Sequence, residues 1–156
     1  MKYALLVCIL FIVRGTLAAE PAPFEMRLVV AEAGDDTQTL THKPYTDAAP
    51  ESVHLKKRAF LDCDAVRHVT WTITKETGQP EIVLTFTEAG GKTLAKVTKA
   101  HLDEQLAILI HGKIAVVAGI RTEIRDGQAH ITGRYTQDEA IAIVKSINKA
   151  VIKEQK

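Results

Sequence analysis

One stretch, residues 106–140, constrains the fold more than any other part of the sequence. The aliphatic and β-branched residues of Leu106–Ile110 and Ile114–Ala118 suit strands packed on a core. Between these runs stand His111 and Gly112, and both residue types enter the left-handed backbone region that a tight turn needs. The stretch therefore predicts two neighbouring antiparallel strands joined by a tight turn.

The second half of this stretch predicts a short strand followed by a helix. Ile131 and Thr132 begin the strand, and Thr136 and Glu139 stand at the spacing of a capping box. The helix is predicted from Gln137 to about Lys153, because apolar residues recur there at steps of three and four. These apolar residues are Ala140, Ile143, Val144, Ile147 and Val151.

The upstream sequence adds more strands and one further helix. Thr87 is positioned to cap that helix, and Asp62 or Asp64 can cap a short helical turn. Trp71 is predicted to lie in the core, although an exposed Trp71 would suggest a binding anchor. The predicted strands are Phe24–Val30, Val53–Lys57, Val69–Ile73 and Ile82–Phe86, and the helix runs from near Glu88 to His101. The fold class is thus α+β, a mainly antiparallel sheet with two principal helices packed on one face.

Residues 1–19 have the pattern of a secretory signal peptide. Lys2 precedes an apolar run from Tyr3 to Val13, and small residues follow Arg14. The run is shorter than the roughly 20 apolar residues that span a bilayer. We therefore expect cleavage after Ala18 or Ala19, no stable membrane span after cleavage, and a periplasmic or secreted protein.

The remaining sequence divides into two parts. Residues 20–52 are predicted to hold the N-terminal strand and a mobile loop, because Gly, Asp, Thr and Pro dominate residues 31–52. That loop is either a variable insertion or a place where a partner binds. Residues 53–153 are predicted to form an α+β domain.

The charge of the chain argues against nucleic acid as a partner. The sequence has 20 Lys and Arg residues and 19 Asp and Glu residues. Loss of the predicted signal peptide removes Lys2 and Arg14, which leaves 18 basic and 19 acidic residues and a net charge of −1. Nucleic-acid binding proteins instead cluster Lys and Arg on one face.

The sequence shows no set of residues with the spacing of a catalytic, metal or nucleotide site. Cys63 is the single cysteine beyond the signal peptide, and the flanking Asp62 and Asp64 oppose formation of its thiolate. The six histidines form no i,i+4 pair and have no cysteine partners. Gly91-Lys92-Thr93 is not a P-loop, because Phe86 stands where that motif needs glycine. We therefore predict no cofactor, no metal and no enzymatic activity.

Several short motifs resemble one known family. They are Leu106-Ala107-Ile108 leading to Gly112-Lys113-Ile114, Ile131-Thr132-Gly133 before Thr136 and Glu139-Ala140, and, upstream, Glu81–Phe86 and Thr98. Together they resemble the head subdomain of the first periplasmic domain of SecD, a membrane protein that assists Sec-dependent export. The chain departs from the family at Val117-Ala118-Gly119 and at Arg134. From its length we expect it to hold neither SecD's membrane helices nor its second lobe. The resemblance implies that residues 53–153 have the SecD-head α+β fold and a polypeptide-binding surface.

The functional prediction is an exported, non-catalytic protein-binding module that assists protein export or holds polypeptide. Its partner would be a protein or an unfolded polypeptide, and its oligomeric state is left open. Two alternatives remain: an accessory or inhibitory protein that docks on one envelope or extracellular partner, and an enzyme with an unrecognised site. The predicted partner-binding residues are Val116, Val117, Ile120 and Ile124. The competing interpretation is that residues 116–120 form a strand buried on both faces.

Overall fold

The computed structural model of the chain describes residues 20–44, 48–133 and 135–154, so the predicted signal peptide lies outside the described residues. The strands are β1 (Phe24–Val30), β2 (Thr37–His42), β3 (Glu51–Lys56), β4 (Leu61–Asp62), β5 (Val66–Ile73), β6 (Pro80–Phe86), β7 (Gln105–Ile110), β8 (Lys113–Gly119) and β9 (Gln128–Thr132). The helices are the 3₁₀ turn η1 (Cys63–Ala65), α1 (Glu88–Ala100) and α2 (Gln137–Glu154). No helix among the described residues has the length and apolar character needed to cross a membrane.

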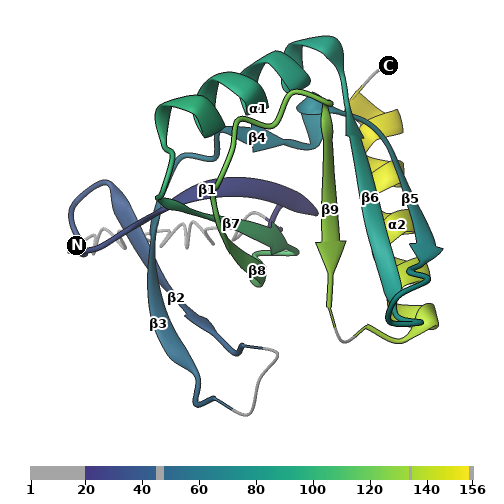
Figure 1. The fold of residues 1–156 in the computed structure, drawn as a ribbon, viewed down its shortest axis with the longest axis horizontal. Helices are drawn as coiled ribbons and strands as arrows, with labels where there is room; N and C mark the ends of the chain where they lie inside the picture. Colours follow the sequence, from purple (N-terminus) through teal and green to yellow (C-terminus); the bar gives the residue numbers. More distant parts are fainter. Residues whose placement is uncertain (1–19, 45–47, 134, 155–156) are drawn as a thin grey trace, which may run out of the picture.

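The strands form two antiparallel sheets. The larger has the order β2-β3-β1-β7-β8, with β4 also paired to β1, and the smaller has the order β5-β6-β9. Helix α2 packs against β5 and β6, whereas α1 packs against β4 and β6 (Figure 1). The predicted α+β class, mainly antiparallel with two helices, is confirmed. The division into two sheets leaves β8 and β9 as the last strands of different sheets.

The predicted hairpin of residues 106–118 is confirmed as β7 and β8. His111 and Gly112 form its turn with φ values of 49° and 73°, in the left-handed region. Ile110 pairs with Lys113, and the register shifts by one residue between Ile108 and Leu109. The turn residues therefore set the pairing, as the sequence indicated.

The prediction of a loop throughout residues 31–52 is wrong for Thr37–His42. These residues form β2, which pairs with β3 over its whole length. The sequence TQTLTH alternates threonines with Gln38, Leu40 and His42, and β-branched threonine suits a strand. The Gly, Asp and Pro residues on either side of this run led to the prediction of a loop.

The strand β1 separates two apolar cores, because successive side chains of a strand point to opposite faces. Phe24 and Met26 lie in the main core, which includes residues of β5, β6, β9 and both helices, and Trp71 packs against it partly buried. Val29 packs on a second, smaller core between the β2–β3 hairpin and β7–β8. That second core contains Val53, Leu55, Ala107 and Leu109, with Leu40, Ile114 and Val117 packed against it.

Both helix starts have the predicted caps. The Thr87 hydroxyl accepts a hydrogen bond from the Gly90 N–H at 3.1 Å. At α2 the Thr136 hydroxyl accepts from the Glu139 N–H at 3.2 Å, and the Glu139 carboxylate accepts from the Thr136 N–H at 2.8 Å. The capping box is therefore formed in both directions, which fixes where α2 begins.

The capping box predicts a loss of stability in acid. Hydrogen bonds from the Thr136 backbone and hydroxyl lower the pKa of Glu139 below its ordinary 4.5. A lowered pKa in the folded state stabilises the fold above about pH 4.5, and this contribution is lost as the pH falls through the folded-state pKa. We expect Glu139→Gln to flatten the fall in urea-unfolding free energy below pH 4.5. An unchanged pH profile in Glu139→Gln would contradict this.

Candidate functional site

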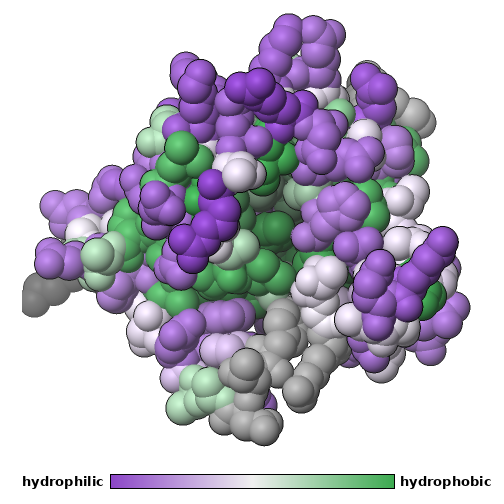
Figure 2. Space-filling model, viewed as in Figure 1, coloured by the Kyte–Doolittle hydropathy of each residue, from purple (hydrophilic) through white to green (hydrophobic). Residues whose placement is uncertain are grey.

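A largely apolar hollow of about 370 Å³ lies between β8, β9 and the segment that joins them. We call it the β8–β9 groove. Its apolar lining consists of Met26, Leu106, Ile108, Val116, Ala118, Ile120, Ile124 and Ala129, and its polar lining includes Arg121, Thr122, Asp126, Gln128 and His130. Figure 2 shows hydrophobic surface near the centre of this face, over β1, β7 and β8, and hollowed toward β9.

The structure brings together three of the four predicted partner-binding residues. Val116, Ile120 and Ile124 all line the β8–β9 groove. Val117 lies on the opposite face of β8, against the second core. Ile120 is only 3% exposed and belongs to the main core, so it supports the floor of the groove rather than its surface.

The strand β8 differs from its neighbour β7 in exposure. All residues of β7 from Leu106 to Ile110 are buried, whereas those of β8 from Ile114 to Ala118 are only partly buried. The alternative of a strand buried on both faces therefore does not describe β8. Because β8 ends the larger sheet, part of its backbone faces away from β7, which is the arrangement that accepts an added strand.

Hydrogen bonds fix the wall of the groove between β8 and β9. The Ile120 N–H donates to the Glu104 carbonyl at 2.8 Å, and the Asp103 N–H donates to the Ile120 carbonyl at 2.8 Å. The Ile124 N–H donates to the hydroxyl of buried Thr98 at 3.0 Å. These bonds hold the segment against α1 and the loop after it, so the groove is formed before any partner arrives.

Ion pairs lie around the groove, although Asp126 forms none among the described residues and accepts a hydrogen bond from the Gln128 N–H at 3.2 Å. Arg121 lies 3.5 Å from Asp103, and His130 lies 3.2 Å from Glu81. Arg125 donates to Glu123 at 2.6 Å, which lowers the pKa of the Glu123 carboxyl and raises the pKa of Arg125. Each pair has at least one exposed partner, and pairs open to solvent contribute little. The apolar lining is therefore the feature of the groove best suited to hold a ligand.

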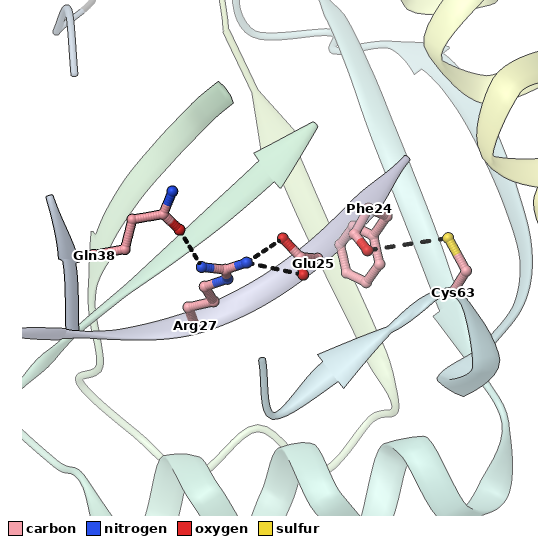
Figure 3. A network of polar contacts seen from close by, with 5 residues as sticks. All are labelled: Phe24, Glu25, Arg27, Gln38 and Cys63. Atoms are coloured by element: carbon pink, nitrogen blue, oxygen red, sulfur yellow. Dashed lines mark hydrogen bonds and ion pairs between the residues drawn. The ribbon is translucent and has the colours of Figure 1, made fainter. Parts of the chain in front are cut away.

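A separate polar network lies on β1. Arg27 donates to both carboxylate oxygens of Glu25, at 3.0 and 2.8 Å, and to the Gln38 side-chain oxygen of β2 at 2.8 Å (Figure 3). Nearby, Cys63 is 5% exposed, with its sulfur 4.0 Å from the Phe24 carbonyl oxygen. The network links β1 to the β2–β3 hairpin, and burial agrees with the prediction of an unreactive thiol.

From the sequence we expect no metal site and no catalytic group in the chain. Among the residues that the structure describes, no three His, Cys, Asp or Glu side chains gather as they would around a metal ion. The titratable side chains that line the groove are Arg121, Asp126 and His130.

Sequence reasoning missed five of the eight apolar residues that line the groove. Met26, Ala129 and the residues of the β7–β8 hairpin come from parts of the chain that only the fold brings together, on the four strands β1, β9, β7 and β8. A signal for Ala118 was present, since it shares a face with Val116 two residues before it.

Comparisons with known proteins agree with this architecture. The family model described as "SecDF, P1 head subdomain" matches residues 37–150, a range that includes β2. A protein translocase subunit SecD of Magnetococcus marinus is 32% identical over 90 residues, which cover 56% of this chain and 17% of that protein. The SecD of Syntrophobacter fumaroxidans is 27% identical over 127 residues, which cover 79% of this chain and 24% of that protein. The chain thus spans about a quarter or less of these relatives.

Solved structures show the same fold. A structure of SecDF, described as a membrane component that enhances protein export, superposes with a TM-score of 0.64 at 23% identity and covers 83% of this chain and 63% of that chain. A structure of SecDF in a super-membrane-facing form superposes equally well, with 83% of this chain and 19% of that chain covered. With the family match extending over most of its residues, the chain belongs to the SecDF P1 head subdomain family.

Proposed function

We propose that this chain is an exported, non-catalytic module that holds an extended segment of polypeptide in the β8–β9 groove, in the periplasm or outside the cell. The family supports a role related to protein export, since its members include translocase subunits SecD and SecDF. The finer role, binding of polypeptide, rests on the groove itself.

One observation carries this proposal: edge strands of two different sheets border a single apolar hollow. β8 is an edge strand of the larger sheet, β9 is an edge strand of the smaller sheet, and both line the groove. An extended polypeptide placed there would offer backbone hydrogen bonds to an open edge and apolar side chains to the floor. Backbone pairing is independent of sequence, so such a groove accepts many unfolded segments and needs no nucleotide to do so.

The proposal predicts that a charge in place of Val116 weakens binding of polypeptide. Val116→Lys is expected to weaken binding of a reduced, carboxymethylated unfolded protein at least tenfold, because burying one valine side chain contributes roughly 1.5–3 kcal/mol. Binding is measured by fluorescence anisotropy of the labelled probe. The same probe protein in its folded, disulfide-bonded form should not bind.

Two further variants make this test specific to the groove. Ile73→Lys places the same charge on β5, an edge strand of the smaller sheet, where Ile73 is 45% exposed and does not line the groove. It should leave binding unchanged. Val116→Thr keeps the size of the side chain and should leave the protein folded, which circular dichroism monitors. Any loss of binding in Val116→Thr would then not be a loss of folding. Equal effects of Val116→Lys and Ile73→Lys would contradict the proposal.

A further inference from the structure

A second hollow, of about 550 Å³, lies beside the first half of β8. It is bounded by the β7–β8 turn, the start of α2 and the residue that follows β2. Its lining consists of Ile110, Ile114, Ala115, Tyr135, Ala142 and Ile143, with Lys43, His111, Lys113 and Glu139. We call it the cationic end.

The cationic end and the β8–β9 groove follow one strand. Lys113, Ile114 and Ala115 line the cationic end, whereas Val116, Ala118 and Gly119 line the groove. Of the residues of β8, only Val117 lines neither hollow, and its side chain lies on the other face. Six of the seven residues of β8 therefore line one hollow or the other, so hollow surface runs from one end of the strand to the other and matches an extended segment of similar length, at about 3.3 Å per residue.

The two hollows differ in charge. In the cationic end, Lys43, His111 and Lys113 are exposed, and no ion pair joins them to any other residue in the described part of the chain. The Glu139 carboxylate accepts hydrogen bonds from the Thr136 N–H and hydroxyl, at 2.8 and 3.1 Å, so the lining holds two lysine charges against one carboxylate. The positive end of the α2 dipole adds to the same sign. In the groove, by contrast, Arg121 is paired with Asp103, and the Asp126 carboxylate adds a negative charge.

We propose that the cationic end recognises a carboxylate at the carboxyl-terminal end of the polypeptide segment that β8 binds. This inference rests on the proposed function. A strand added antiparallel to β8 runs in the opposite direction, so its carboxyl-terminal residues lie beside Lys113, where β8 begins. The occupant is therefore an extended segment, apolar along the groove and acidic at its carboxyl-terminal end.

The test uses three fluorescent heptapeptides with amidated C-termini and the same five apolar residues. One ends in Asp-Glu, one begins with Asp-Glu, and one carries Asn-Gln at its end. The peptide that ends in Asp-Glu is expected to bind about twofold to fivefold more tightly than the other two at low salt, as for exposed ion pairs. Lys113→Ala and Lys43→Ala should each reduce this preference, and about 1 M salt should remove it.

Lys99→Ala is the matched control, because Lys99 lies in the last turn of α1 and lines neither hollow. It should leave the preference intact. Equal affinity for all three peptides would overturn the cationic end as a recognition site while leaving polypeptide binding in the groove supported. Failure of every peptide to bind would overturn both. A preference for Asp-Glu that survives Lys113→Ala and Lys43→Ala would also overturn the assignment.

Discussion

Replacing Ile120 with alanine is expected to lower the free energy of unfolding by about 2–4 kcal/mol, the usual cost of removing buried aliphatic carbons. Ile120 is 3% exposed and packs in the main core, while its N–H and carbonyl are held by Glu104 and Asp103. The cavity left by the substitution cannot close easily, since both neighbouring peptide groups are fixed. Urea denaturation followed by circular dichroism measures the change.

Ile124→Ala is the matched comparison for Ile120→Ala. Ile124 lines the same groove but is only partly buried, so its truncation should cost less stability. It should still weaken polypeptide binding, because it removes apolar surface from the groove. If Ile120→Ala instead left stability within about 0.5 kcal/mol of the parent while abolishing binding, Ile120 would be a surface contact and the groove would be wrongly described.

Local signals in the sequence predicted the elements with definite ends. His111 and Gly112 favour a turn, because both residue types enter the left-handed backbone region, and the structure places both there. Thr136 and Glu139 likewise specify a helix start through hydrogen bonds between residues three apart. Each signal involves neighbours in the chain, so each can be recognised without the fold.

The parts of the structure that the sequence did not predict depend on contacts between residues distant in the chain. β2 is stabilised by pairing with β3 and by Leu40 packing on the second core, and neither feature is visible in the Thr-rich run alone. The sequence also grouped Val116 with Val117 as one binding segment. The pleat of β8 sends these side chains to different cores, so only Val116 lines the groove. The groove itself arises because the strands divide between two sheets, which no local pattern indicates.

Successive side chains of β1 point to opposite faces of the sheet, and those of Glu25 and Arg27 point away from the main core. Their side chains are 17% and 12% exposed. Arg27 Nε is buried and has no hydrogen-bond partner among the described residues, so Glu25 supplies most of the compensation for the guanidinium charge. Glu25→Gln is therefore expected to cost about 2–4 kcal/mol in urea unfolding, somewhat less than the 3–5 kcal/mol for breaking a fully buried pair.

The double variant Glu25→Leu, Arg27→Met separates the cost of an unpaired charge from any intrinsic need for the ion pair. Replacing both partners with apolar residues leaves no charge to compensate, so it should regain most of the stability that Glu25→Gln loses. Gln38→Ala removes one hydrogen bond between β1 and β2 and should cost only about 1 kcal/mol. If the double variant were as unstable as Glu25→Gln, the pair itself, rather than avoidance of an unpaired Arg27, would hold the β2–β3 hairpin on the sheet.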